Sequence, residues 1–245
     1  VDAGSPPDRT AFVAAHPEKA DGLRSFFNDL TGIRKINGLA RINSCHRSGE
    51  LLLQRYRLDV LIGEGGFGEV WKAIDLDTGE LVALKALHGH WCRDTSRIER
   101  FRAGAKYMDM LRHPGIVAVH GELGVDEGRH YYAMPWLAGG DLRQAVLEGR
   151  VAAEQGLAII ADALEGLVHA HAKGLVHRDV KPHNILIDDA GKGAISDFDL
   201  VLAEGSTQGT RTGMGLGSIV YAAPEALMDA STVDARADAY GAGLS

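Results

Sequence analysis

The stretch His177-Arg178-Asp179-Val180-Lys181-Pro182-His183-Asn184 carries the strongest chemical pattern in this chain of 245 residues. A carboxylate at Asp179 can accept a proton from a hydroxyl group or orient that hydroxyl for attack. The ammonium of Lys181 can neutralise charge on a phosphoryl group in transit, and the side-chain carbonyl of Asn184 can bind a hard metal ion such as Mg²⁺. The stretch therefore predicts a phosphoryl-transfer site in which Asp179 and Lys181 are catalytic residues.

A second acidic motif follows at Ser196-Asp197-Phe198-Asp199, where Asp197 lies 13 positions after Asn184. Its carboxylate offers a further oxygen ligand for Mg²⁺. Phosphoryl transfer requires mainly the positioning of the reactants and the neutralisation of charge, and these residues can supply both. We therefore predict that Asn184 and Asp197 bind the metal.

A glycine-rich motif lies upstream, at Gly63-Glu64-Gly65-Gly66-Phe67-Gly68-Glu69-Val70. Glycines allow the main chain to come close to phosphates, so that backbone N–H groups can face the phosphate oxygens. A dinucleotide-binding turn has a similar pattern but leads into a helix, whereas residues 70–74 read as a strand. The motif therefore favours a glycine-lined hairpin that covers the phosphates of a nucleotide.

The segment Val82-Ala83-Leu84-Lys85 places a lysine at the end of an apolar strand. A buried ammonium is costly unless an anion lies beside it, and the phosphates of ATP would be such an anion. From this segment alone, a strand lysine that reaches solvent is the simpler interpretation.

Together with Ala223-Pro224-Glu225, these motifs occur in the order and spacing of the eukaryotic-like protein kinase catalytic domain, which the chain resembles over about residues 55–245. The form Asp179-x-Lys181-x-x-Asn184 resembles the Ser/Thr branch, and the general style is similar to bacterial Ser/Thr kinases. The resemblance implies an α+β, bilobal fold with an antiparallel-sheet N-lobe and a mostly helical C-lobe. Because the chain stops soon after Asp238, we expect this C-lobe to be incomplete and the chain to be part of a longer protein.

Hydrophobic periodicity and turn residues agree with that order of elements. We expect an N-terminal helix and linker in residues 1–54, an N-lobe with its hinge in 55–137, and a partial C-lobe in 138–245. The expected strands are 56–63, 69–75, 81–87, 116–123 and 130–134. The expected helices are one that starts at a capping box formed by Ser96 and Glu99 and reaches residue 111 or 112, and two more at 141–148 and 152–173.

The resemblance also implies roles for individual residues. Met134 would be the gatekeeper beside adenine, residues 135–137 the hinge, and Asp141 a contact to the ribose. The implied nucleotide-binding residues are Gly63, Gly65, Gly66, Phe67, Gly68, Val70, Ala83, Lys85, Met134, Trp136, Leu137, Asp141 and Leu186. Lys85 is also an implied catalytic residue, and Asp238 would anchor the catalytic loop.

Arg178 precedes Asp179 and could bind a phosphate on the activation segment. The candidate phosphorylation sites are Ser206, Thr207, Thr210 and Thr212. For each of them, a solvated loop residue is the simpler interpretation.

Two positions depart from the family pattern. The glutamate that normally pairs with the strand lysine lies 19 residues after it, and here that position is Gly104. We therefore expect Lys85 to lack its orienting partner and the helix around Gly104 to be loosely held. Asp199 replaces the glycine of the usual Asp-Phe-Gly motif, and we expect its side chain to face solvent rather than to hold a metal.

The net charge, the cysteine count and the lengths of the apolar runs argue against several classes of protein. The formal net charge of −7 argues against a general nucleic-acid binder. Two cysteines, Cys45 and Cys92, are too few for a disulfide framework and indicate a reducing compartment, which predicts a cytoplasmic location. No apolar run approaches the roughly 18–20 residues of a membrane span. His88, His90 and Cys92 read as a connecting loop rather than a metal site, and two histidines of the long helix, at 169 and 171, read as packing residues.

The leading prediction is a protein Ser/Thr kinase that uses ATP and Mg²⁺, acts on protein substrates and self-associates for trans-autophosphorylation. The alternative is a pseudokinase that binds nucleotide and acts as a scaffold or allosteric partner, and Gly104 and Asp199 motivate it. A small-molecule kinase of the same fold ranks third, because the segment that ends at Ala-Pro-Glu suits protein substrates.

Overall fold

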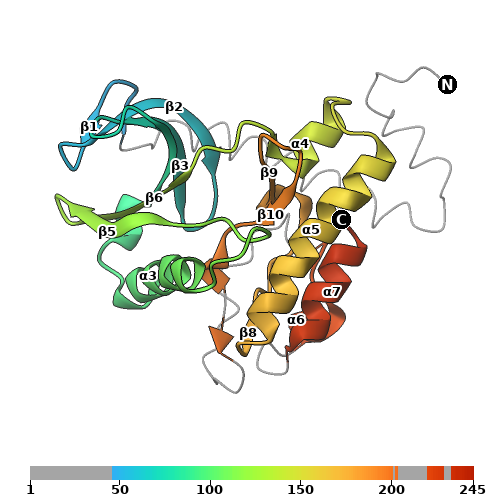
Figure 1. The fold of residues 1–245 in the computed structure, drawn as a ribbon. Helices are drawn as coiled ribbons and strands as arrows, with labels where there is room; N and C mark the ends of the chain where they lie inside the picture. Colours follow the sequence, from blue (N-terminus) through green and yellow to red (C-terminus); the bar gives the residue numbers. More distant parts are fainter. Residues whose placement is uncertain (1–45, 201, 204–219, 229–232) are drawn as a thin grey trace, which may run out of the picture. The chain divides into compact units, whose positions relative to one another are not determined.

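The structure, a computed structural model, describes residues 46–200, 202–203, 220–228 and 233–245 (Figure 1). The chain divides into two units, 1–46 and 47–245, and every element described below belongs to the second. The predicted N-terminal helix, Cys45 and the candidate phosphorylation sites between residues 206 and 212 lie outside the described residues.

An antiparallel sheet of six strands forms the first half of the described unit, in the order β1-β2-β3-β4-β6-β5. Its strands are β1 (Leu51–Leu52), β2 (Tyr56–Glu64), β3 (Gly68–Asp75), β4 (Leu81–Leu87), β5 (His120–Asp126) and β6 (Arg129–Pro135). Side chains of successive residues in a strand point to opposite faces, and Leu58, Trp71 and Leu84 form a buried cluster. The first three predicted strands are confirmed to within one residue at each end. The predicted strand 116–123 begins too early, because Ile116 forms only an isolated bridge with Ile195.

The helix α3 (Thr95–Met110) follows β4 after the short turn η2 (Gly89–Trp91). Its N-cap is Asp94, whose carboxylate accepts a hydrogen bond from the N–H of Arg97 at 3.2 Å. The predicted capping box was therefore wrong, because Asp94 caps the helix two residues earlier and places Ser96 and Glu99 inside it. Phe101, Ala105 and Met108 share the buried face of α3, which contacts β5 and the turn η4 (Phe198–Leu200).

Helices dominate the second half. The long helix α5 (Ala153–His171) runs beside α7 (Ala235–Gly243) and packs against the short strand β10 (Gly193–Ile195) (Figure 1). The remaining elements are β7 (Gly140–Asp141), α4 (Leu142–Leu147), β8 (Leu175–Val176), η3 (Pro182–Asn184), β9 (Ile185–Ile187), β11 (Leu202–Ala203) and α6 (Pro224–Met228). The predicted helices near 141–148 and 152–173 are confirmed, and so is the α+β class. No helix in the described part of the chain is both long and apolar enough to cross a membrane.

A single buried cluster joins the two halves, from Phe101 and Leu111 to Leu167 and Ala242. Within it, the segment after α3 lies directly against α5. A Cβ atom at Gly166 would overlap the carbonyl group of Gly115, and a Cβ atom at Gly115 would overlap the carbonyl oxygen of Asp162. Only a pair of glycines allows these two backbones to approach so closely.

We expect Gly166→Ala to destabilise the protein by about 1–3 kcal/mol, because the added methyl group would force the two backbones apart. Gly156→Ala is the matched control in the same helix, since its Cβ would have only Val151 within 4 Å, at 3.8 Å. The control should stabilise the helix by up to about 1 kcal/mol through helix propensity. Urea unfolding monitored by circular dichroism measures both changes, and equal effects of the two variants would contradict this account of the packing.

Candidate active site

The predicted catalytic loop lies between β8 and β9, and it brings three predicted residues into contact. The ammonium of Lys181 lies 2.6 Å from Oδ2 of Asp179. The side-chain Nδ2 of Asn184 donates to the backbone oxygen of Asp179 at 2.8 Å and to its Oδ2 at 3.1 Å. A carboxylate, an ammonium and an amide therefore meet at one place.

His177 holds this loop from the inside and is fully buried. Its Nδ1 accepts a hydrogen bond from the N–H of Asp179 at 3.2 Å, so the ring proton resides on Nε2, which lies 2.8 Å from the backbone oxygen of Ser196. The ring also packs edge-on against Phe198, with centroids 4.7 Å apart. The imidazole thus joins the catalytic loop to the acidic motif that contains Asp197.

Asp238 fixes the same loop from α7, as predicted. Its carboxylate accepts hydrogen bonds from the backbone N–H groups of His177 at 2.8 Å and Arg178 at 2.7 Å. Arg178 has a φ of 69°, a left-handed conformation that is uncommon for residues other than glycine. The bonds from Asp238 support this conformation. His171 does more than pack, because its Nε2 lies 2.7 Å from the Asp238 carboxylate.

Lys85 lies on β4 with only 5% of its side chain exposed. Its ammonium is 2.6 Å from Oδ1 of Asp197 and 2.5 Å from Oδ2 of Asp199. The prediction that Lys85 would lack a partner was therefore wrong, since it has two carboxylates.

Asp199 does not face solvent as predicted. Its side chain is 8% exposed, against 35% for Asp197. Of the two carboxylates that contact Lys85, that of Asp197 is therefore the more accessible. Asp199 lies in a 3-10 turn and its φ is not positive, so this position does not require a glycine. The left-handed conformation in this motif occurs at Asp197 instead, with φ 66°.

Gly104 packs against the same motif. A Cβ atom at Gly104 would lie 3.0 Å from Oδ1 of Asp199 and 3.0 Å from the backbone oxygen of Phe198. Both distances are tighter than ordinary contacts, and Gly104 is buried in α3. The helix at Gly104 is thus in close contact with the acidic motif rather than loosely held.

Burial and charge set the protonation of this group. Burial alone would lower the pKa of Lys85, but Asp197 and Asp199 raise that pKa well above its ordinary value. Burial also disfavours the charged form of Asp197, yet Lys85 holds the pKa of Asp197 below its ordinary value. The pKa of Asp199 is raised by its burial, and repulsion from Asp197 adds to this effect. The environment therefore favours the ionised form of Asp197 more than that of Asp199.

The glycine motif forms the predicted hairpin between β2 and β3, in which the N–H of Gly65 donates to the oxygen of Gly68 at 2.9 Å. Gly63 is the second-last residue of β2, Gly66 lies in the turn, and Phe67, which follows it, is buried. A Cβ atom at Gly68 would overlap the carbonyl of Ala86 on the neighbouring strand. The chain at this turn continues as a strand, which distinguishes it from a dinucleotide-binding turn.

The implied adenine-site residues also come together. Ala83 on β4 lies opposite Met134 on β6, and both belong to the main buried cluster. The partly buried side chains that pack against this cluster include Val70, Trp136, Leu137 and Leu186. Asp141 caps α4, where its Oδ1 accepts from the N–H of Gln144 at 2.9 Å. One of its oxygens is therefore already engaged in the structure of the helix.

Comparison with known proteins agrees with this geometry. A family model described as "Protein kinase domain" matches residues 56–245. This chain belongs to the protein kinase family. Its resemblance to the bacterial Ser/Thr branch is also confirmed by the names and organisms of its relatives.

Three relatives are bacterial proteins named as serine/threonine kinases. Serine/threonine-protein kinase PknA of Mycobacterium tuberculosis is 42% identical over 205 residues, which cover 81% of this chain and 47% of PknA. Serine/threonine-protein kinase PknL of the same organism is 38% identical over 196 residues, or 79% of this chain and 48% of PknL. A probable serine/threonine-protein kinase, pknA2 of Bifidobacterium longum, is 36% identical over 199 residues, or 80% of this chain and 26% of the relative. The chain thus spans about half the length of these curated relatives, or less.

Side chains of the turn between β4 and α3, chiefly His88 and Trp91, bind the glycine hairpin of this kinase domain, and we call this contact the strap. The sequence did not predict it. Nε2 of His88 lies 2.8 Å from the backbone oxygen of Gly65, and the indole N–H of Trp91 donates to the oxygen of Gly66 at 2.9 Å. The guanidinium of Arg97 stacks 4.3 Å from the ring centroid of Trp91 and 5.0 Å from that of Phe67. A tryptophan in a short strand-to-helix turn was the available signal.

This turn is also where the histidines and Cys92 lie. No group of three or more side chains able to hold a metal occurs among the residues that the structure describes. His88, His90 and Cys92 lie in the segment that connects β4 to α3, as predicted for a connecting loop, and His88 also contacts the glycine hairpin.

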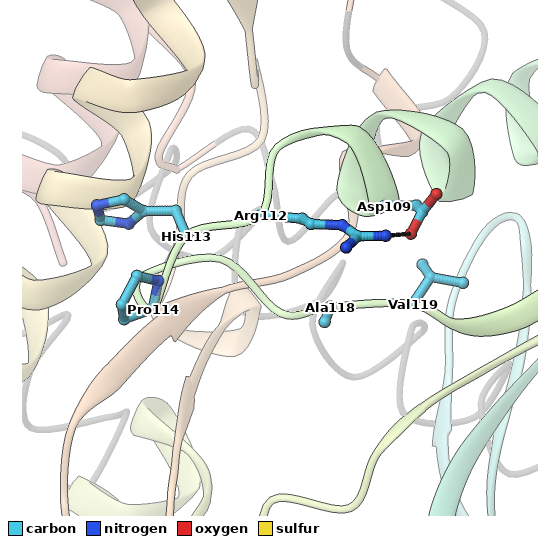
Figure 2. Close-up of a pocket in the computed structure, with 6 residues that line it drawn as sticks. All are labelled: Asp109, Arg112, His113, Pro114, Ala118 and Val119. Carbon is cyan, nitrogen blue, oxygen red and sulfur yellow. Dashed lines mark ion pairs between the residues drawn. The ribbon is translucent and has the colours of Figure 1, made fainter.

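A surface hollow of about 410 Å³ lies at the C-terminal end of α3 (Figure 2). It is lined by Asp109, Arg112, His113, Pro114, Ala118 and Val119. None of the predicted site residues is among them, so this hollow is separate from the candidate active site.

We expect Trp91→Phe to loosen the glycine hairpin, because phenylalanine keeps most of the aromatic packing but cannot donate to the oxygen of Gly66. A net loss of about 0.5–1.5 kcal/mol corresponds to about two- to tenfold faster amide exchange in the hairpin. Hydrogen exchange of a peptide that covers residues 63–70 measures the change. The β5–β6 turn at Gly128 serves as an internal control, and equal acceleration in both turns would show a global effect instead of a strap.

Proposed function

We propose that this chain is the catalytic domain of a protein kinase that transfers the γ-phosphoryl group of ATP to Ser or Thr hydroxyls of proteins. The observation that carries the proposal is the ion-paired set around the acidic motif and the catalytic loop. Lys85 contacts Asp197 at 2.6 Å, and Lys181 contacts Asp179 at 2.6 Å. These ion-paired side chains are the charged protein groups that the proposed phosphoryl transfer would use.

Each residue has a definite task in this proposal. Asp179 accepts the proton of the attacking hydroxyl or orients that hydroxyl, and Lys181 compensates negative charge near it. Lys85 binds phosphate oxygens from the side of the sheet. These tasks require no rearrangement of the hydrogen bonds that Asp238 and His177 make to the catalytic loop.

The donor set fits Mg²⁺. Asn184 and Asp197 would hold the ion, since a carboxylate and an amide oxygen are hard ligands and Asp197 has the lowered pKa of the acidic pair. When bound, the ion supplies charge neutralisation on the phosphoryl oxygens. The apolar cluster around Ala83 and Met134 suits the adenine ring, and the glycine hairpin suits the phosphates.

Phosphorylation of the activation segment is part of the proposal. The guanidinium Nε of Arg178 is buried and has no hydrogen-bond partner among the described residues. Burial lowers the pKa of this arginine, and Asp238 partly opposes that shift. A phosphate on Ser206, Thr207, Thr210 or Thr212 would supply the missing acceptor. Such a modification by a second copy would require self-association of the protein.

The scaffold alternative rested on Gly104 and Asp199. Asp199 provides a carboxylate for Lys85, so the departure at Gly104 no longer argues for a decayed site. A small-molecule kinase ranks third, because the segment that ends at Ala223-Pro224-Glu225 suits protein substrates. A cytoplasmic location belongs to the proposal as well, because the cytoplasm supplies ATP and keeps a thiol such as that of Cys92 reduced.

We expect the intact protein to phosphorylate itself on Ser or Thr in the presence of Mg²⁺ and ATP, with phosphopeptides mapped by mass spectrometry. Asp179→Asn should lower the rate by about 10²- to 10⁴-fold, because it removes the proton acceptor, and a chelator of Mg²⁺ should stop the reaction. The exposed Asp189→Asn is a matched control that should leave the rate unchanged. A thermal shift with ATP but no phosphate transfer would instead identify the scaffold.

A further inference from the structure

We propose that Asp199 is the positioning residue for Lys85, and that Gly104 leaves the space in which its carboxylate lies. The proposal rests on the proposed function, because Lys85 matters there as a ligand of phosphate. The carboxylate that α3 lacks at Gly104 is supplied by Asp199 of the acidic motif. The two departures from the family pattern therefore compensate each other.

Burial distinguishes the two partners of Lys85. Both carboxylates are within 2.6 Å of the ammonium, but the side chain of Asp199 is 8% exposed and that of Asp197 is 35% exposed. The half-buried Asp197 is the residue proposed to bind Mg²⁺. Asp199 faces α3 and remains with Lys85 whatever Asp197 contacts.

Steric contact with α3 shows why Gly104 and Asp199 belong together. The space for a side chain at Gly104 is already occupied, since a Cβ there would be 3.0 Å from Oδ1 of Asp199. The same Cβ would lie 3.0 Å from the oxygen and 3.1 Å from the carbonyl carbon of Phe198. An acidic side chain on α3 at this position and the observed Asp199 therefore exclude each other.

An aromatic side chain also lies beside Lys85. Tyr132 lies opposite Lys85 on β6, with its ring centroid 5.9 Å from the ammonium, and Phe101 of α3 packs against that ring at 5.0 Å. Both aromatic side chains are buried. A buried ammonium requires a nearby anion, and Asp199 is the more buried of the two carboxylates that contact Lys85.

One consequence concerns control of the kinase. The metal ligand Asp197 and the lysine anchor Asp199 are two residues apart in one segment. A displacement of this segment would disturb both functions at once, whereas α3 contributes no charge to Lys85. The position of Lys85 thus depends on the acidic motif rather than on a carboxylate of α3.

The test exchanges the residues at positions 104 and 199 in the intact protein and measures kcat and the KM for ATP of each variant. We expect Asp199→Gly to lower kcat/KM by at least tenfold, and Asp199→Asn to do the same while keeping the size of the side chain. Gly104→Glu alone should also lower it, because the new side chain meets Asp199. The double variant Gly104→Glu/Asp199→Gly should recover to within a few-fold of the original protein, since removal of the Asp199 side chain frees the ammonium for the glutamate and leaves only the contact with the backbone of Phe198, which a shift of a few tenths of an ångström relieves. Gly243→Glu, a helix glycine with nothing within 4 Å of its Cβ, is the control for adding a glutamate.

A second measurement does not depend on phosphate transfer. Thermal unfolding of Lys85→Met, Asp199→Asn and their double variant forms a cycle in which direct pairing predicts a clearly non-additive change in Tm. If the original protein transfers no phosphate, the proposed function fails while this cycle still tests the pair. Additive Tm changes would overturn the proposal. So would an active protein whose double variant Gly104→Glu/Asp199→Gly is no better than the worse single variant.

Discussion

The buried ammonium of Lys85 is the constraint on which the rest of the site depends. An ion removed from water must have counter-charges nearby, and here both come from residues more than 100 positions further along the chain. Because Lys85 belongs to the sheet and Asp197 and Asp199 belong to the segment after β10, the ion pair ties the strand-rich half to the catalytic loop. The sheet and the segment that carries the acidic motif are thereby held in one arrangement by electrostatics as well as by the common apolar cluster.

The acidic motif is itself held by a connected set of hydrogen bonds and ring contacts. Phe198 packs on His177, the ring of His177 bonds to the oxygen of Ser196, and Asp238 of α7 bonds to the backbone of His177. Each of these groups is buried, so none can exchange its partner for water without cost. The conformation around Asp179 is therefore determined by the packing of α7 as well as by the catalytic loop. This explains how a carboxylate in a loop can have a definite position.

Local patterns predicted what depends on local structure. The alternation of strands, the hairpin at the glycine motif and the residues of the catalytic loop follow from neighbours in sequence, and so they were found. The contacts of His171, the strap of Trp91 and the partners of Lys85 join distant segments, and no local pattern reports such distances. The cap at Asp94 was missed for a different reason, because the capping-box pattern of Ser96 and Glu99 was taken as the start of the helix, whereas the carboxylate of Asp94 accepts the hydrogen bond from the N–H of Arg97. Asp238 was foreseen only through family resemblance, since its bonds to the loop span about 60 residues.

Gly104 and Asp199 show how two local defects can form one working contact. Judged separately, a glycine inside a helix and an aspartate beside another acid are both unfavourable. The positions are 95 residues apart in sequence, yet the Cβ site of one lies 3.0 Å from the carboxylate of the other. The requirement at Lys85 is for negative charge at a given point in space, and electrostatics does not distinguish which element of the fold carries that charge. An absent residue in a family motif is therefore weak grounds for inferring lost activity until the space around its partner has been inspected.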